Sequence, residues 1–423
     1  MEIGIIGTGD MGKSYAKEFA RAGYRVNCTD LPENRERLEK DLAGSGVHIL
    51  DDGVAVSRRS DIIFYLVPVE EIEKAVAQYG PSTRKDAVVS SGTSVMTPAV
   101  ESFEGYLPED VSIVNWHWLF GPSIKPQGQS TALVNHRSSN NAYKRARDTF
   151  ESVGTKIIEL HSYQEHDKIT ADTQAVTHVG FEAMGTAWKN MGSSPWENPT
   201  YVGGIDNVKV LMCLRIYGGK SHVYSGLAIH NPFAREQIRQ YAKSVTELFS
   251  LMIQEDEKQL RERIKTARNF IFKDGNPHIL LDDKVMGEFS LGIPSEQRTP
   301  NSHLSLFSMA DAWHKTGVNP YGNMICQTPP FRLRLGIVEY LFRNPELLEE
   351  SIQTSLSDLK LRDPNLEFHT AVREWATIIG NGDVGGYHKQ FGDTRTFFAD
   401  SIPEGMKKSG ELIRRLSETS YVS

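Results

Sequence analysis

The stretch VNWHWLFGP (114–122) places a histidine, His117, between two indole side chains and ahead of a Gly-Pro turn. Buried aromatic walls around an imidazole would shift its pKa. Because most histidines in a chain are structural, this stretch alone favours a buried core histidine over a catalytic base. The position of His117 favours catalysis, since His117 and Ser94 both lie at the ends of expected strands, where open α/β sheets bind their ligands. Both interpretations stay open at this point.

A second chemical motif lies at the start of the chain, over residues 2–30. An apolar strand, a G-x-G-x-x-G turn and a helix-spaced apolar stripe follow one another. Gly7 permits the sharp turn, Gly9 lets the backbone approach a pyrophosphate, and Gly12 allows close packing of helix on strand. This order predicts a dinucleotide-binding unit. We expect the cofactor to be bound by Gly7, Thr8, Gly9, Asp10, Met11, Gly12, Asp30, Arg35, Val67 and Gly92.

Asp30, at the end of the second expected strand, bears on the choice of cofactor. A carboxylate there usually accepts a hydrogen bond from the ribose 2′-hydroxyl and repels a 2′-phosphate, which favours NAD. Arg35 and Arg37 follow closely and could pair with a phosphate, which favours NADP. The residues themselves argue both ways.

The first half of the chain alternates between short strands and helices. Further strands are expected at 61–68, 86–94, 111–122, 131–136 and 155–160. This alternation predicts an α/β Rossmann domain over residues 1–160, with ligands bound at the carboxyl ends of its strands.

Helical periodicity replaces the strands from residue 161 to 423, which predicts an all-α second domain. Gln174 and His178 are four residues apart and project from one helical face. A polar segment rich in Gly and Pro, 274–301, is expected to be a long loop. Further helices are expected at 209–230, 232–254, 256–272, 302–317, 329–343, 345–360 and 365–380.

The second half also contains a repeat. Residues 177–196 recur without a gap at 302–321, with His178 matching His303. Residues 227–238 resemble 340–351, and the two matches occur in the same order. They predict an internally duplicated, pseudo-dimeric helical unit, of about 170–272 and 302–380. The alternative is that helices of similar amphipathicity resemble one another.

Composition argues against several classes of protein. The net charge is −7 and the Lys and Arg residues are scattered, so no basic stripe for nucleic acid is expected. No apolar run approaches membrane-spanning length. Cys28, Cys213 and Cys326 lie far apart and fit neither a disulfide framework nor a zinc site, so we expect no metal and a reducing compartment. Since the first strand leaves no room for a signal peptide, we expect the cytoplasm.

With these motifs in view, the chain resembles the fungal prephenate dehydrogenases nearly end to end. The most specific stretches are QEHDKITADTQAVTH (164–178), GLAIHNP (226–232) and PNSHLSL (300–306). The resemblance implies oxidation and decarboxylation of prephenate to 4-hydroxyphenylpyruvate in tyrosine biosynthesis. It also implies NADP, with NAD possible, and we side with NADP because Asp30 could turn away to solvent.

The resemblance implies roles for individual residues. His117 matches the family histidine that takes the proton of the substrate hydroxyl while a hydride leaves. Ser94 matches a serine that bonds this hydroxyl or the histidine, and Met96 stands where a lysine is usual. Gln174 and His178 match residues that face the substrate.

The arginine that binds a substrate carboxylate in bacterial relatives has no counterpart here, since Leu227 and Tyr340 occupy the matching places. Two desolvated carboxylates cannot be left unpaired, so another cation must take this role. The candidates are Arg215, Lys220 and Arg332.

Three other functions remain open. An arogenate dehydrogenase would differ only in the substrate side chain, and no single residue decides between the two. A β-hydroxyacid dehydrogenase would use Lys168 as its catalytic lysine, but residue 172 is Asp where that family has Asn. A non-catalytic nucleotide sensor would use the Rossmann half as a switch.

Bacterial relatives resemble dimers whose helical domains interlock. A duplicated helical unit would supply both halves of that interface on one chain. We therefore expect a monomer with one active site and a pseudo-two-fold helical domain. A loose homodimer through another surface is compatible with this expectation.

Overall fold

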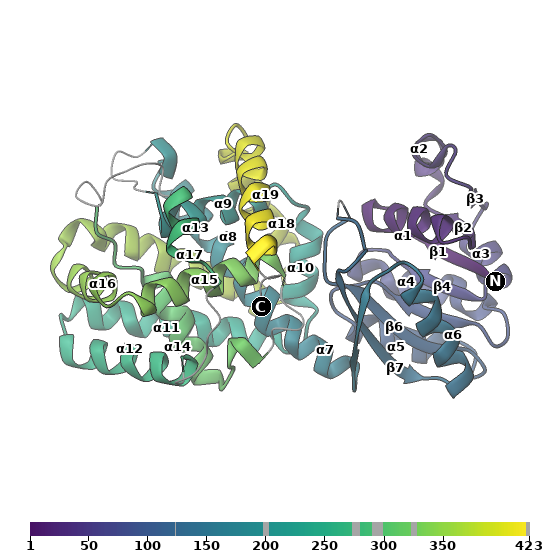
Figure 1. Ribbon diagram of the computed structural model, residues 1–423, viewed down its shortest axis with the longest axis horizontal. Helices are drawn as coiled ribbons and strands as arrows, with labels where there is room; N and C mark the ends of the chain where they lie inside the picture. The colour runs from purple at the N-terminus through teal and green to yellow at the C-terminus, as the bar shows by residue number, and fades with distance from the viewer. Residues whose placement is uncertain (123, 198–202, 273–279, 290–298, 323–327, 420–423) are drawn as a thin grey trace. The chain divides into compact units, whose positions relative to one another are not determined.

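The structure, a computed structural model, describes residues 1–122, 124–197, 203–272, 280–289, 299–322 and 328–419 (Figure 1). The contacts within it divide the chain into two compact units. One comprises Met1–Thr170 with His230–Pro232, and the other Ala171–Ile229 with Phe233–Ser423. The strands end near residue 160, as expected, but the compact first unit continues to Thr170 because it includes helix α7 (Tyr163–Thr170).

The described part of the first unit contains one sheet of eight strands, in the order β3-β2-β1-β4-β5-β6-β7-β8. Strands β1 to β6 are parallel, β7 is antiparallel to β6, and β8 is parallel to β7. The order reverses between β1 and β4, which makes this the switch point where such sheets bind ligands. The strands are β1 (Glu2–Ile6), β2 (Arg25–Thr29), β3 (Val47–Ile49), β4 (Ile62–Tyr65), β5 (Val88–Ser91), β6 (Ser112–Trp118), β7 (Ser130–Arg137) and β8 (Lys156–Leu160).

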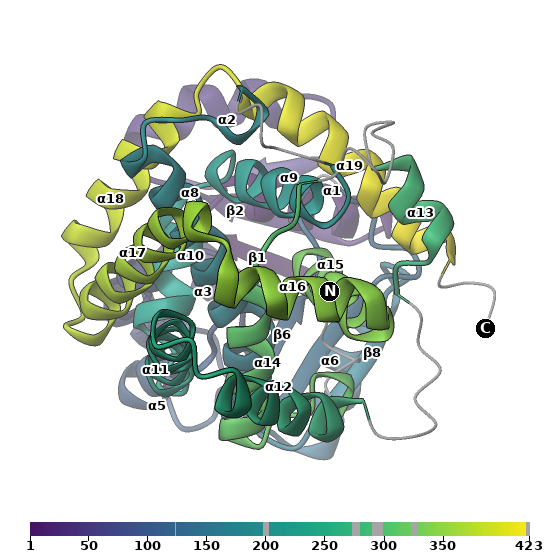
Figure 2. The ribbon, with the colours of Figure 1, turned by 90° about the vertical axis from the view of Figure 1, so that its left-hand side faces the viewer.

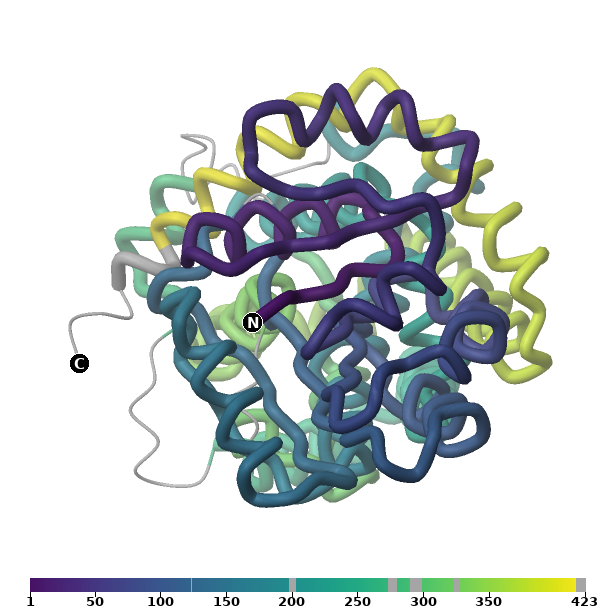
Figure 3. The backbone as a smooth tube through the Cα atoms, turned by 90° about the vertical axis from the view of Figure 1, so that its right-hand side faces the viewer, coloured from purple at the N-terminus to yellow at the C-terminus, as the bar shows by residue number. Residues whose placement is uncertain are grey.

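Helices cover both faces of the sheet, which confirms the predicted Rossmann-type α/β fold (Figure 3). One core packs α1, α2 and α6 on the strands, and the other packs α3, α4 and α5 on the opposite face. These helices are α1 (Asp10–Arg21), α2 (Arg35–Leu42), α3 (Gly53–Arg59), α4 (Ile72–Tyr79), α5 (Thr97–Tyr106) and α6 (Asn140–Glu151).

The described part of the second unit is helical, as predicted (Figure 2). It begins with a π-helical turn, η4 (Ala171–Ala175), that leads into α8 (Val176–Asn190). The helices that follow are α9 (Ile205–Tyr217), α10 (Ser221–Ile229), α11 (Ala234–Ile253), α12 (Glu257–Ile271), α13 (Asp283–Glu288), α14 (Leu304–Thr316), α15 (Pro329–Arg343), α16 (Pro345–Ser357), α17 (Arg362–Gly380), α18 (Val384–Phe397) and α19 (Ile402–Thr419).

Two predicted segments differ from the structure. The single helix expected over 209–230 is two helices, α9 and α10, because the chain leaves the helix at the glycine pair Gly218–Gly219. The loop expected over 274–301 contains helix α13, and much of the remainder of this segment lies outside the described residues.

The two segments of the suspected repeat form helices α8 and α14. Helix α8 packs on α17, α14 packs on α11, and α11 packs on α17. If α8 corresponds to α14 and α11 to α17, these contacts exchange with one another, as a pseudo-two-fold arrangement requires. The contacts agree with a duplicated unit, and the duplication itself stays a prediction.

Many helices of the second unit are deeply buried, yet they carry polar side chains. Helix α8 is buried from Val176 to Ala187 and includes His178, Glu182 and Thr186. Among the described residues, we find no helix that combines the length and apolar content needed to cross a bilayer.

Candidate active site

The structure brings the two catalytic candidates of the first unit together. His117 lies on β6, and Ser94 lies in the segment between β5 and α5. Strands β5 and β6 are parallel neighbours, so their carboxyl ends meet at one edge of the sheet. There, Ser94 Oγ and His117 Nε2 lie 3.2 Å apart. This distance allows a hydrogen bond between the hydroxyl and the imidazole.

The expectation of aromatic walls around His117 is wrong. Side chains alternate across a strand, so the neighbours of His117 on β6 point to the opposite face of the sheet. Trp116 and Trp118 belong to the core formed with α1 and α6, where they pack against Tyr15 and Phe150. The two indoles therefore hold β6 in place, and His117 has a polar environment of its own.

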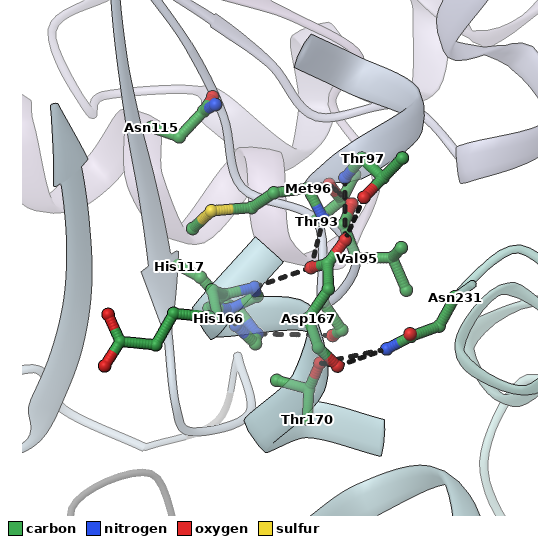
Figure 4. Close-up of polar contacts among 12 residues, drawn as sticks. Thr93, Val95, Met96, Thr97, Asn115, His117, His166, Asp167, Thr170 and Asn231 are labelled. Atoms are coloured by element: carbon green, nitrogen blue, oxygen red, sulfur yellow. Dashed lines mark hydrogen bonds and ion pairs between the residues drawn. The ribbon is translucent and has the colours of Figure 1, made fainter. Parts of the chain in front are cut away.

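That environment consists of two residues that the sequence analysis did not select. The Nδ1 atom of His117 lies 2.8 Å from Nε2 of His166, and Nδ1 of His166 lies 2.8 Å from Oδ1 of Asp167 (Figure 4). His166 and Asp167 are fully buried on α7. We call Ser94, His117, His166 and Asp167 the catalytic row. The His-Asp pair stood in the stretch QEHDKITADTQAVTH, but nothing local showed that α7 docks beside β6.

The carboxylate of Asp167 also fixes the start of α5. Its Oδ1 accepts a hydrogen bond from the backbone N–H of Met96 at 2.8 Å. Its Oδ2 accepts from the backbone N–H of Thr97 at 2.8 Å and from the Thr97 hydroxyl at 2.7 Å. A carboxylate at a helix N-terminus is favoured by the partial positive charge of the free N–H groups. Asp167 therefore acts as an acceptor on both oxygens.

Further hydrogen bonds position the loop that carries Ser94 and the end of α7. Thr93 Oγ1 donates to the carbonyl oxygen of Val95 at 2.6 Å, which closes a tight turn around Ser94. The side chain of Asn231 donates to the carbonyl oxygen of Asp167 at 2.7 Å (Figure 4). The row is thus supported at both ends.

The direction of the hydrogen bonds sets the tautomers. Because Asp167 accepts, His166 carries its proton on Nδ1 and presents the lone pair of Nε2 to His117. His117 then carries its own proton on Nδ1 and keeps a free lone pair on Nε2, facing Ser94. Burial, and then the neighbouring imidazole of His166, hold the pKa of His117 well below its usual range. His117 is therefore neutral near pH 7 and can accept a proton at Nε2.

The glycine turn fits a dinucleotide. Gly7 has a φ of +92°, which favours glycine, and a Cβ on Gly12 would lie 2.1 Å from the carbonyl oxygen of Gly7. A Cβ on Gly9 would meet nothing within 4 Å, so the backbone there is open to a ligand. Helix α1 begins directly after Gly9 with no side-chain cap, which leaves its N–H groups available to a phosphate.

Two other cofactor candidates lie beside this turn. A Cβ on Gly7 would approach the side chain of Val67 within 2.8 Å, and a Cβ on Gly92 would approach Leu66 within 2.3 Å. Gly7, Val67 and Gly92 follow β1, β4 and β5, the neighbouring strands at the switch point. The residues present here therefore fit a nicotinamide cofactor. Helix α1 supplies the two remaining candidates, the exposed Asp10 and the half-buried Met11.

The expectation that Asp30 turns away to solvent is wrong, because its carboxylate turns back to the glycine turn. Oδ2 accepts from the backbone N–H of Thr8 at 2.6 Å and from the Thr8 hydroxyl at 2.7 Å. Oδ1 accepts from the N–H of Leu31 at 2.8 Å and from Asn34 at 2.7 Å. Burial raises the pKa of Asp30, but these hydrogen bonds together hold it below its ordinary value. Four donors occupy the roughly four acceptor sites of a carboxylate.

The expected phosphate-binding arginines are exposed. Arg35, at the start of α2, forms ion pairs with Glu39 at 3.2 Å and Asp51 at 3.1 Å. Arg37 is exposed one position beyond Glu36. Arg35 follows Asp30 within one short turn, so its side chain starts from the same end of β2.

In the second unit, Gln174 and His178 are 4% and 8% exposed. Each has a buried nitrogen without a hydrogen-bond partner among the described residues, namely Nε2 of Gln174 and Nδ1 of His178. Buried polar atoms are nearly always satisfied, so such atoms are where a polar ligand would bind. Burial, and then the charge of Arg334, lower the pKa of His178 to about 3.

The three candidate cations lie in different environments. Arg215 on α9 contacts the Ser409 hydroxyl at 3.4 Å, and burial lowers its pKa. Lys220 is exposed between α9 and α10. Arg332 on α15 is half-buried, and burial lowers its pKa. The structure does not select one of them.

Sequence analysis missed one buried cation, Arg334. It is fully buried and donates to the carbonyl oxygen of Thr177 at 2.9 Å and to the Tyr241 hydroxyl at 2.8 Å. Its guanidinium occupies the space that a side chain at Gly180 would fill. Arg334 therefore braces α8 next to His178.

Other chemistry has less support from the described residues. Lys168, the lysine that a β-hydroxyacid dehydrogenase would use, is exposed on α7 next to the buried Asp167. Among the residues that the structure describes, no group of three or more His, Cys, Asp or Glu side chains could hold a metal ion.

The fold and the site define a two-unit, Rossmann-type dehydrogenase with a neutral histidine at the strand ends. Residues 175–418 match a family model for the "6-phosphogluconate dehydrogenase C-terminal domain", and residues 2–93 match "NADP oxidoreductase coenzyme F420-dependent". A probable prephenate dehydrogenase [NADP(+)] of Schizosaccharomyces pombe is 42% identical over 99% of this chain and 98% of that protein. The prephenate dehydrogenase [NADP(+)] of Saccharomyces cerevisiae is 43% identical over 98% of this chain and 93% of that protein. The chain belongs to this family of fungal prephenate dehydrogenases.

A solved structure shows the same fold. The prephenate dehydrogenase of A. aeolicus, crystallised with hydroxyphenyl propionate and NAD+, superposes with a TM-score of 0.52 at 20% identity. The match covers 63% of this chain and 95% of that one.

Proposed function

We propose that this chain oxidises and decarboxylates prephenate to 4-hydroxyphenylpyruvate with NADP, in tyrosine biosynthesis. The observation that carries the proposal is the neutral His117 held 3.2 Å from Ser94 at the ligand-binding edge of the sheet. Two relatives named prephenate dehydrogenase [NADP(+)], alike over nearly the whole chain, give the substrate and the cofactor.

The oxidation needs a base at one atom. The ring carbon that bears the hydroxyl gives up a hydride, and the hydroxyl must lose its proton at the same time. Nε2 of His117 has the free lone pair for this proton, and the Ser94 hydroxyl is placed to bond the same oxygen. NADP, when bound, accepts the hydride, and the glycine turn with the start of α1 would hold its pyrophosphate.

Decarboxylation follows from the product of the first step. A ketone in the ring makes the loss of carbon dioxide downhill, because the electrons left behind make the ring aromatic. This step asks the chain to hold the substrate rather than to supply another base. We propose Gln174 and His178 for this task in the second unit, together with a cation from among Arg215, Lys220 and Arg332.

We further propose NADP over NAD, with Arg35 as a partner of the 2′-phosphate and Asp30 as a support of the glycine turn. On the wide separation of the cysteines, we propose the cytoplasm as the compartment.

Turnover assays test the proposed function. The purified chain is given prephenate or arogenate, each with NADP or NAD, and reduced cofactor and released carbon dioxide are measured. We expect equal amounts of both products with prephenate and NADP. The absence of turnover with prephenate would overturn the proposal, and faster turnover with arogenate would change the substrate.

A further inference from the structure

The two imidazoles behind the substrate hydroxyl differ in what lies next to them. His117 contacts Ser94 and His166, both uncharged in the resting arrangement. His166 contacts a carboxylate, with Nδ1 2.8 Å from Oδ1 of Asp167. His117 is 5% exposed, and His166 and Asp167 are fully buried, so water screens these contacts little.

A positive charge is therefore costly at one imidazole and compensated at the other. On His117, a buried imidazolium would have no carboxylate of the described residues hydrogen-bonded to it, and burial already holds the pKa of this group well below its usual range. On His166, the same charge would form a buried, hydrogen-bonded ion pair with Asp167.

We propose that His166 is the final acceptor of the proton that leaves the substrate, and that Asp167 holds His166 in the tautomer that allows this. The proposal rests on the proposed function. As the hydride leaves the ring carbon for NADP, the O–H proton moves to Nε2 of His117, and the Nδ1 proton of His117 moves to Nε2 of His166. His117 ends neutral with its proton on Nε2, and His166 ends as an imidazolium beside Asp167. The reverse shift later returns the proton to solvent.

Asp167 is well fixed for this role. The backbone N–H groups of Met96 and Thr97 and the Thr97 hydroxyl hold its two oxygens at 2.7 to 2.8 Å. Asn231 holds its backbone carbonyl. Since the carboxylate cannot rotate without losing the start of α5, it keeps accepting from Nδ1 of His166. His166 and Asp167 are thus positioning residues that act through His117.

Nitrogen NMR of histidines in the protein with NADP bound tests the proposal without substrate. We expect both His117 and His166 to carry the proton on Nδ1 at neutral pH. On acidification, the first proton added to the row should appear on His166. The groups that face His166 are His117 on β6 and Asp167 on α7. A proton on Nε2 of neutral His166, or first protonation of the row without a charged His166, would overturn the proposal.

Kinetics of two variants give the second arm. In His166→Gln, the amide oxygen can still accept from Nδ1 of His117, so the base stays oriented but cannot pass its proton on. We expect kcat to fall about tenfold to a hundredfold, with the Kd of NADP changed by less than about twofold. The control is His136→Gln, which removes another histidine–carboxylate pair of the first unit, 2.8 Å from Glu104, and should leave kcat unchanged.

Each outcome separates the two proposals. If kcat of His166→Gln stays within about threefold of the unaltered protein, the proton is not passed to His166. If prephenate is not turned over at all, the proposed function fails, while the NMR arm still decides the arrangement of protons. Asp167→Asn should reproduce the loss of kcat. If that variant does not fold, His166→Gln and the NMR measurement carry the test.

Discussion

At the scale of the residue, the site depends on which groups are neutral and which atoms are already bonded. His117 acts through the lone pair on Nε2, which exists only while the imidazole is uncharged. Since its neighbours on β6 face the other side of the sheet, the hydrogen bonds of His117, rather than aromatic walls, set its tautomer. The direction of those bonds depends in turn on Asp167 accepting at both oxygens.

The pH dependence of kcat/KM should change when His166 is replaced. In the unaltered protein, the acid limb reports the first proton bound by the whole row. In His166→Gln, it reports His117 alone, whose pKa burial lowers. A lowered pKa means that the inactive, protonated base forms only at lower pH. We therefore expect the acid limb of the variant to move to lower pH while its maximum rate falls. An acid limb at an unchanged pH would contradict this account.

Asp30 should support binding of NADP and NAD alike. In Asp30→Asn, an amide N–H would face the donors of Thr8 or Asn34, which costs about 1–3 kcal/mol in the glycine turn. We expect the Kd of both cofactors to rise by about fivefold to a hundredfold, with their ratio changed by less than about threefold. Titration of the protein with each cofactor, followed by fluorescence, measures this.

Arg35→Ala is the matched variant. It removes a cation near the 2′-phosphate and should weaken NADP while leaving NAD unchanged. If Asp30→Asn instead improves NADP relative to NAD, then Asp30 reads the ribose directly.

At the scale of the element, two glycines of one turn should separate folding from cofactor binding. In Gly12→Ala, the new Cβ would lie 2.1 Å from the carbonyl oxygen of Gly7, so α1 must shift away from β1. We expect a loss of about 1–3 kcal/mol in the free energy of unfolding. In Gly9→Ala, the new Cβ meets nothing within 4 Å, so stability should hold while NADP binding weakens.

Thermal unfolding without cofactor and titration with NADP measure the two effects. Equal loss of stability in both variants would show that Gly9 has a structural role. Unchanged NADP binding in Gly9→Ala would show that no phosphate approaches the backbone there.

The sequence predicted local features well. The strand, the glycine turn and the start of α1 follow from neighbouring residues, and so does the position of Ser94 and His117 at strand ends. His166 and Asp167 were missed because their role depends on α7 packing beside β5 and β6, which is a tertiary contact. The orientation of Asp30 was also out of reach, since Thr8, Leu31 and Asn34 compete with solvent for its oxygens.

At the scale of the whole molecule, we predict a monomer. The exchangeable contacts of α8 with α17 and of α14 with α11 lie within one chain, so the faces that would pair across two subunits are covered internally. Light scattering at micromolar concentration should give the mass of one chain, 47.4 kDa. A stable dimer whose helical units interlock across chains would refute this prediction, whereas a loose dimer through another surface would not.

The central claim is that His117 removes the proton of the prephenate hydroxyl, and one measurement tests it most directly. The rate of NADPH formation from prephenate is compared for the unaltered protein and for His117→Asn, with His136→Asn as the control histidine. We predict that kcat of His117→Asn falls by about two to four orders of magnitude, with little change in the Kd of NADP. A kcat within about threefold of the unaltered protein would contradict the claim and return His117 to a structural role.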